Sequence, residues 1–137
     1  MWVELPLGEV IDRITILDLK ASRLPTQPGR EAAQARRREL AAGWERLELP
    51  AVDTLEQWPE LVRVNTALWE VEDALREHER AATFGPAFVA LARSVYALND
   101  ERASCKRRID ESLGSRWREW KSYAGSGGVL GRTATNG

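Results

Sequence analysis

Residues 64–76 carry amide, indole, carboxylate and guanidinium groups at a spacing that brings them together on a helix. At 3.6 residues per turn the segment has an apolar stripe made of Val64, Leu68, Val71 and Leu75. The polar and aromatic residues beside this stripe are Asn65, Trp69, Glu72, Asp73 and Arg76. A helix side that only meets solvent rarely places a large indole among its charges. We therefore expect this surface to contact another helix or a ligand.

A second helix is expected to present a matching set of polar residues. Its polar side contains Arg93, Tyr96, Asn99, Asp100, Ala103, Lys106 and Asp110, and Arg102 interrupts its apolar stripe. Because only the turn Thr83-Phe84-Gly85-Pro86 separates the two helices, they should pack antiparallel. We predict that Glu72 or Asp73 faces Arg93 or Arg102, and that Arg76 faces Asp100.

The first helix of the chain should add to this polar seam. Asp12 and Asp18 border its apolar stripe, and Thr15 lies between them. One interpretation is an ion-pair network that sets the register of the helices, since buried charge pairs contribute specificity more dependably than stability. The other is a ligand site between helices, where bundles place their cofactors. The first interpretation is favoured, and the two are compatible.

Two enzymatic alternatives use the same residues. Mg²⁺ prefers oxygen ligands, and a metal site would draw on Glu70, Glu72 and Asp73 with Asp12 and Asp100. The all-α nucleotide pyrophosphohydrolases use paired acidic helical motifs, but here Glu9-Val10-Ile11-Asp12 and Glu70-Val71-Glu72-Asp73 lie too far apart in sequence. The segment from Leu7 to Ile14 also resembles the start of chorismate mutase, which has an arginine where this chain has Gly8. We expect no bound metal and no cofactor.

Composition excludes several classes of function. Lys and Arg number 20 against 21 Asp and Glu, so no net field attracts nucleic acid or an anionic membrane. Cys105 and His78 are the single residues of their types, which argues against a disulfide and a zinc site. The start of the chain does not resemble a signal peptide, and no apolar run approaches the roughly twenty residues of a membrane span. A cytoplasmic protein with no membrane span is expected.

Proline and glycine divide the chain into helical segments. Apolar residues recur at helical spacing from about Leu7 to Leu24, and an alanine- and arginine-rich segment from Arg30 to Leu47 should form a surface helix. Helices are also predicted over residues 58–82 and 86–113, with Gly114 just past the end of the last one. The fold class is therefore all-α: an antiparallel bundle of three long helices plus one shorter surface helix. Residues 1–123 should form a single domain, and residues 124–137 a flexible Gly/Ser-rich tail.

The order of several motifs resembles the small bacterial family called domain of unknown function 6165. The motifs are Leu7 to Lys20, Val64-Asn65, Leu68-Trp69, Glu72-Asp73, Arg76, Phe84, Leu91 to Tyr96, Asn99 to Arg102, and Lys121-Ser122-Tyr123. The resemblance covers nearly the whole chain up to Tyr123. It implies a stand-alone helical protein, and some members accompany tetratricopeptide repeats or glycosyltransferases of surface polysaccharides.

Taken together, these features favour a non-enzymatic interaction module. It should form a homo-oligomer and bind a protein partner in surface-glycan assembly, as the resemblance implies. Six tryptophans support this, because they exceed what one modest core readily hides and aromatic residues favour interfaces. The alternative is a small-molecule or metal-dependent enzyme with an acidic and arginine-rich site between helices. The residues proposed for the polar network or ligand site are Asp12, Thr15, Asn65, Trp69, Glu72, Asp73, Arg76, Arg93, Asn99, Asp100 and Arg102.

Overall fold

The computed structural model describes the backbone of residues 4–127 and the side chains of residues 4–114. The regular structure in this part of the chain is entirely helical, which confirms the all-α prediction. Its elements are α1 (Leu7–Arg23), α2 (Gln27–Arg46), the short 3₁₀ helix η1 (Val52–Thr54), α3 (Trp58–Ala81) and α4 (Pro86–Gly127). None of the helices in the described residues combines the length and apolar character needed to cross a membrane.

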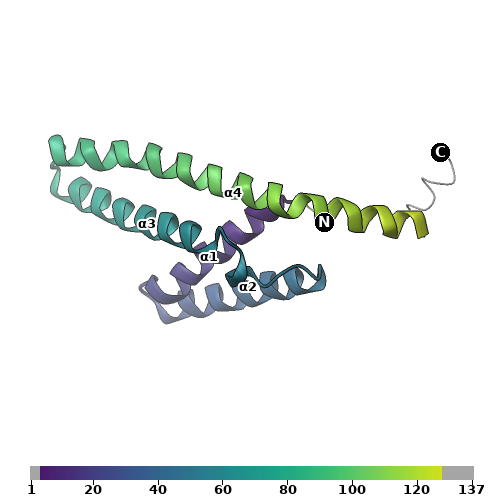
Figure 1. Ribbon diagram of the computed structural model, residues 1–137. Coiled ribbons are helices and arrows are strands. Elements are labelled where there is room, and N and C mark those ends of the chain that lie inside the picture. The colour runs from purple at the N-terminus through teal and green to yellow at the C-terminus, as the bar shows by residue number, and fades with distance from the viewer. Residues whose placement is uncertain (1–3, 128–137) are drawn as a thin grey trace.

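The helices form two hairpins. Helices α1 and α2 make one, α3 and α4 make the other, and α1 crosses the α3–α4 hairpin obliquely (Figure 1). Helix α1 contacts all three other helices and is the central element, while α2 packs on its outer side. One detail of the predicted bundle is wrong, because α2 has 20 residues and α1 only 17. Helix α1 is central because its residues are buried among the other helices, not because it is the longer helix.

Local capping explains where α2 begins and where α3 ends. Thr26 Oγ1 accepts a hydrogen bond from the backbone N–H of Gly29 at 3.2 Å, and Pro28 occupies the first turn of α2. This pair starts α2 at Gln27, three residues before the predicted Arg30. Helix α3 ends where Ala82 adopts the left-handed conformation, with φ of 54°.

The end of α4 differs from the prediction. Gly114 lies inside the helix, which continues to Gly127. A glycine ends a helix when its backbone turns to positive φ, and Gly114 does not do so. Residues 124–127 of the predicted flexible tail are thus the last turn of α4. Residues 128–137 lie outside the described part of the chain.

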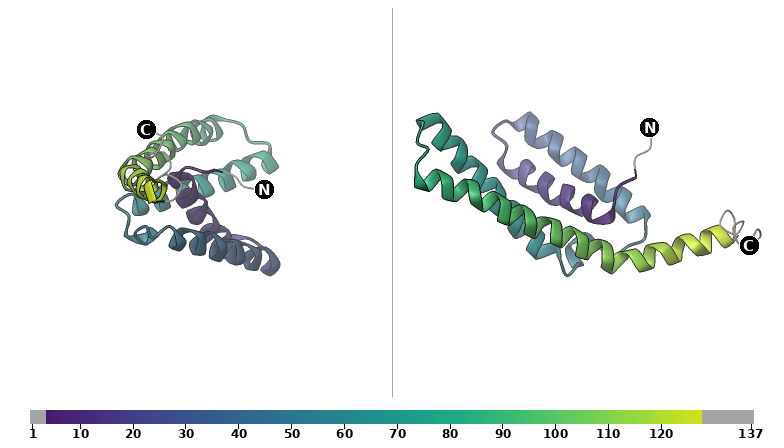
Figure 2. Two further views of the ribbon diagram at one scale, coloured as in Figure 1. Left: turned by 90° about the vertical axis from the view of Figure 1, so that its right-hand side faces the viewer. Right: turned by 90° about the horizontal axis from the view of Figure 1, so that it is seen from above.

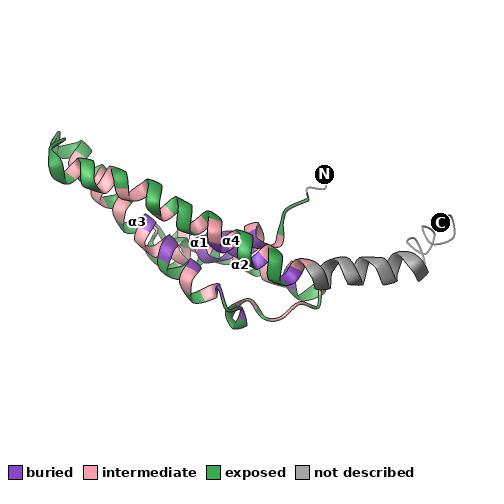
Figure 3. Cartoon of the chain, turned by 45° about the horizontal axis from the view of Figure 1, so that its top comes forward, coloured by how far each residue is buried: buried purple, intermediate pink, exposed green. Residues whose placement is uncertain are grey.

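The hydrophobic core lies where all four helices meet. Its buried residues are Ile11, Trp44, Leu55, Leu61, Cys105, Ile109 and Leu113. The indole N–H of Trp44 donates to the carbonyl oxygen of Pro50 at 2.8 Å, which satisfies its one polar atom in the core. Figure 3 shows the buried parts of the chain, in purple, gathered around α1 and the adjoining parts of α3 and α4.

The far part of the α3–α4 hairpin lies outside this core. From Trp69 to Ser104 no residue is buried, although the two helices pack on each other. We call residues 71–98, which include the hairpin turn, the arm. The arm projects beyond α1 and α2 in Figure 1 and in the right-hand view of Figure 2.

Candidate functional site

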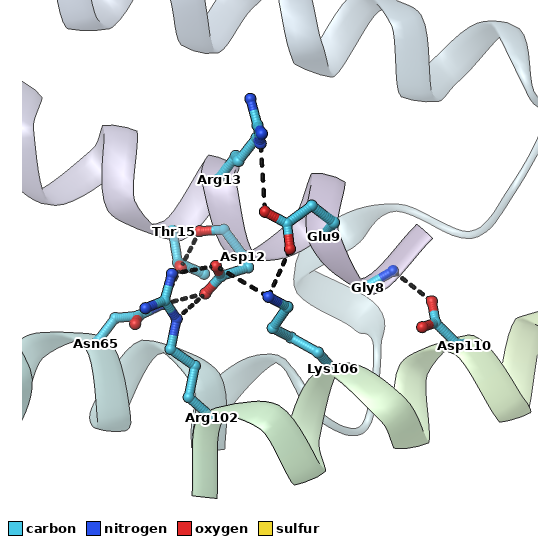
Figure 4. A network of polar contacts seen from close by, with 9 residues as sticks. All are labelled: Gly8, Glu9, Asp12, Arg13, Thr15, Asn65, Arg102, Lys106 and Asp110. Carbon is cyan, nitrogen blue, oxygen red and sulfur yellow. Dashed lines mark hydrogen bonds and ion pairs between the residues drawn. The ribbon is translucent and has the colours of Figure 1, made fainter. Parts of the chain in front are cut away.

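The side chain of Asp12 is the centre of a polar cluster that joins α1 to α3 and α4. Asp12 is fully buried. Arg102 on α4 donates to it from Nε at 2.9 Å to Oδ1 and from Nη2 to Oδ2, and Asn65 on α3 donates from Nδ2 to Oδ1 at 2.9 Å (Figure 4). Helices α3 and α4 therefore both bind the carboxylate of a residue of α1 that is far from them in sequence. We call Asp12, Thr15, Asn65 and Arg102 the Asp12 clasp.

Thr15 completes the clasp from one turn further along α1. Its hydroxyl donates to the backbone carbonyl of Asp12 at 2.7 Å and accepts from Asn65 Nδ2 at 2.6 Å. The Asn65 amide thus bridges the carboxylate and the hydroxyl, and both acceptors are buried. Among the described side chains, no buried nitrogen or oxygen atom lacks a hydrogen-bond partner. A polar cluster satisfied in this way gives the helices one register.

A second layer of charge lies beside the clasp. Lys106, four residues after Arg102 on α4, pairs with Glu9 at 2.5 Å and lies 3.8 Å from Asp12. The bond from Lys106 holds the pKa of the Glu9 carboxyl below its usual value against the opposing effect of burial. The bonds to Asp12 likewise raise the pKa of the Arg102 guanidinium above its usual value. Both cations of α4 are therefore fixed against α1 by carboxylates.

The first turn of α1 lies unusually close to α4. The backbone N–H of Gly8 donates to Asp110 Oδ1 at 2.7 Å. A Cβ at Gly8 would overlap the carbonyl oxygen of Lys106 and lie 3.0 Å from its carbonyl carbon. Only glycine permits this approach. An arginine, which chorismate mutase has here, would not fit without displacing α1, so this position does not support that alternative.

Two open hollows lie on either side of Arg102. The larger, about 430 Å³, lies between α1, α2 and α4 and is lined by Glu9, Asp12, Arg13, Ile16, Leu17, Lys20, Arg36, Leu40 and Arg102. The smaller, about 230 Å³, lies between α1 and the α3–α4 hairpin and is lined by Ile16, Leu19, Lys20, Asn65, Leu68, Trp69, Glu72, Asn99 and Arg102. Ile16, Lys20 and Arg102 line both, so the two hollows adjoin. We call them the cationic hollow and the tryptophan hollow, and together the groove.

The structure brings seven of the eleven proposed site residues together. Asp12, Thr15, Asn65 and Arg102 form the clasp, and Trp69, Glu72 and Asn99 line the tryptophan hollow with Asn65 and Arg102. Glu72 lies on the same hollow as Arg102, but no ion pair joins them among the described residues. The groove therefore includes the start of the polar helix side recognised at residues 65–76.

The other four proposed residues do not join this cluster. Arg76 pairs with Asp73 in its own helix at 2.7 Å, and both side chains are 59% exposed. Arg93 and Asp100 are also exposed. The predicted pairing of Arg76 with Asp100 is wrong, as is that of Asp73 with Arg93. In the described part of the hairpin the apolar stripes face each other, which leaves these flanking charges in solvent, where a neighbour three residues away is the nearer partner.

The carboxylates considered for a metal site are likewise dispersed. Asp12 is taken up by Arg102 and Asn65, Asp73 pairs with Arg76, and Glu70 pairs with Arg23 at 3.5 Å. Within the described residues, no group of three or more His, Cys, Asp or Glu side chains could hold a metal ion. The arrangement of these acids gives the metal alternative no support.

Several residues of the site were not among those proposed from sequence. Glu9 lies one turn from Asp12 on the same face of α1, so extending that face by three residues would have found it. Lys106, which the sequence already placed on the polar side of its helix, lies one turn from Arg102. Lys20 is two turns beyond Asp12 on the same helix and was detectable in the same way. Arg36 reaches the cationic hollow only through the packing of α2 on α1, and its local sequence carries no signal for this.

The fold and the site define an all-α protein in which two helical hairpins are held together by a buried carboxylate. The chain belongs to the family of unknown function DUF6165, whose model matches residues 1–128. This confirms the resemblance found in the sequence. Neither the search of curated proteins nor that of solved structures gave a match.

Proposed function

We propose that this protein is a non-enzymatic interaction module that forms a homodimer through its arm. The observation that carries the proposal is the lack of any buried residue between Trp69 and Ser104, a span that includes the whole arm. Helices in proteins are stabilised mainly by packing of an apolar face. A second copy would supply the packing surface that α1 and α2 supply to the rest of the hairpin.

The composition of the arm supports an apolar interface. The inner stripe of α4 contains Phe88, Leu91, Val95 and Leu98, all only partly buried against α3. Phe84, Val89 and Tyr96 are exposed, Tyr96 by 75%. Val89 and Tyr96 are seven residues apart and therefore share one side of α4. Large apolar and aromatic residues gathered on one surface are typical of interaction sites.

A twofold arrangement suits this surface. Two arms packed side by side would make a four-helix bundle in which each half-exposed stripe becomes interior. The same residues of both copies would then meet, as a closed symmetric dimer requires. The Asp12 clasp supports the non-enzymatic part of the proposal, because its carboxylate already accepts from Arg102 and Asn65. A protein partner in surface-glycan assembly is a further proposal, and it rests on the family resemblance.

The oligomeric state tests the proposal directly. Size-exclusion chromatography with light scattering should give twice the mass of one chain. The double variant Val89→Glu/Tyr96→Glu should give the mass of one chain with an unchanged helical circular dichroism spectrum, because both side chains are exposed. Val62→Glu is the matched control, since Val62 is an exposed apolar residue of α3 outside the arm, and this variant should remain dimeric. A wild-type protein that stays monomeric at high concentration would contradict the proposal.

A further inference from the structure

We propose that the groove binds a sugar phosphate, with the phosphate in the cationic hollow and the sugar ring against Trp69. This goes beyond the proposed dimer and does not depend on it. The first observation is the charge of the cationic hollow. Four basic and two acidic side chains line it. Both acids are already paired, Asp12 with Arg102 and Glu9 with Lys106 and Arg13.

Two cations of the hollow have little competition for an anion. Among the described residues Lys20 forms no ion pair, and Arg36 has only a 3.5 Å contact with Glu39 on the exposed side of α2. Both side chains are exposed, so they can reach a ligand at little desolvation cost. In Figure 4, Arg13 extends from α1 away from α4 and beyond Glu9. A dianionic phosphate would supply the negative partner that Lys20 and Arg36 lack in the hollow.

Arg102 lies between the two hollows, and its guanidinium is already oriented to bind a phosphate. Asp12 accepts from its Nε and Nη2, which fixes the plane of the guanidinium. Its Nη1 has no partner among the described contacts and remains available as a donor. A guanidinium held by a buried carboxylate loses little side-chain entropy when it binds phosphate, and its planar donors match phosphate oxygens.

The tryptophan hollow suits a polar ring. The indole of Trp69 lies with Leu19 and Leu68 on one hollow, so the lining has an apolar surface. Glu72 and Asn99 line the same hollow and offer a carboxylate and an amide for hydrogen bonds. Apolar walls with a few polar groups at the edge are the usual composition of small-ligand sites. A sugar ring has apolar faces and hydroxyl groups around its edge, and it would match both features.

The experiment uses the full chain and three probes: glucose 1-phosphate, inorganic phosphate and glucose, each titrated by isothermal calorimetry. Glucose 1-phosphate should bind at least tenfold more tightly than phosphate, and glucose alone should not bind. The double variant Lys20→Ala/Arg36→Ala should weaken glucose 1-phosphate at least tenfold, because two phosphate partners are removed. Trp69→Ala should weaken glucose 1-phosphate but leave the affinity for phosphate unchanged.

Arg38→Ala is the matched control, because Arg38 is an exposed arginine of α2 that lines neither hollow. It should bind all three probes as the wild type does. Circular dichroism establishes that each variant is folded. No binding of glucose 1-phosphate at millimolar concentration would overturn the inference, and so would equal losses in Lys20→Ala/Arg36→Ala and Arg38→Ala. The failure of the dimer proposal would appear in the mass of the protein and leave these affinities unaffected.

Discussion

Individual carboxylates of this protein do very different things, depending on what surrounds them. Asp12 and Asp73 both pair with an arginine. Asp12 is buried and accepts hydrogen bonds from two helices, whereas Asp73 is 59% exposed and pairs within its own helix. Removing one partner of a buried pair leaves the other charged and desolvated. An exposed pair is solvated with or without its partner.

Replacing Asp12 by alanine should therefore strongly destabilise the fold. We expect the free energy of unfolding to fall by about 3 kcal/mol, because Arg102 and Asn65 lose their acceptor. Urea unfolding at pH 7, followed by circular dichroism, measures the change. Asp73→Ala is the control and should change the free energy of unfolding by less than about 0.5 kcal/mol. Equal decreases in the free energy of unfolding for the two variants would show that the clasp stabilises the fold no more than an exposed ion pair does.

At the scale of the helices, the junction between α1 and α4 depends on a single missing side chain. Gly8 lets the first turn of α1 approach the backbone of α4, and the Gly8 N–H then bonds to Asp110. This approach lies one turn from Asp12 and so helps to bring the clasp residues within hydrogen-bond distance. Gly43, in contrast, has nothing within 4 Å of where its Cβ would be.

The substitution of these two glycines by alanine should have opposite effects. Alanine favours a helix over glycine by roughly 1 kcal/mol, so Gly43→Ala should stabilise the protein by up to that amount. Gly8→Ala should lower the free energy of unfolding by about 1–3 kcal/mol, because its Cβ would overlap the Lys106 carbonyl and force α1 away from α4. Thermal and urea unfolding of both variants measure the difference. Stabilisation by Gly8→Ala would mean that the close approach does not exist in solution.

At the scale of the whole molecule, ion pairs join each pair of packed helices. Arg37 of α2 pairs with Asp18 of α1, Arg23 of α1 with Glu70 of α3, and Arg63 of α3 with Glu101 of α4. Lys106–Glu9 and Arg108–Glu60 add links from α4 to α1 and α3. Stability should thus respond to pH through these pairs and through the buried thiol of Cys105.

The pH dependence of stability should show a plateau with two edges. The bond to Lys106 lowers the pKa of Glu9, and the bond to Arg108 lowers the pKa of Glu60. Both contribute stability above the usual value of 4.5 and lose it as the pH falls through their folded-state values. Burial raises the pKa of Cys105 from 9.0 to about 11, so the unfolded chain releases this proton first and stability should fall between pH 9 and 11.

Urea midpoints measured from pH 3 to 11 check both edges. Glu9→Gln should shrink the acid edge, and Cys105→Ala should remove the part of the alkaline edge that comes from the thiol. Cys105 is fully buried, so the alanine variant will also be less stable throughout. The informative quantity is therefore its slope against pH. An unchanged slope between pH 9 and 11 would show that the thiol does not contribute.

Much of this architecture follows from sequence alone, because helical periodicity and proline and glycine breaks are local. The positions of α1 and α3 were predicted to within a residue or two at each end. Gly114 misled the prediction, because a glycine ends a helix only when its backbone adopts positive φ, and residue type does not determine that. The polar side at residues 65–76 also follows from helical spacing, but only its Asn65, Trp69 and Glu72 reach the clasp or the groove, whereas Asp73 and Arg76 lie in solvent.

Tertiary structure decided which of those polar residues meet. The crossing of α1 over the α3–α4 hairpin brings Asp12, Asn65 and Arg102 together from three helices. Arg76 and Asp73 have equally suitable chemistry but lie on a side of the hairpin that no other helix covers, so they pair locally in solvent. Residue types and spacing thus determined the helices and their polar faces. The crossing geometry, set by the packing of Ile11, Ile109 and the approach at Gly8, decided which charges became buried and where the groove lies.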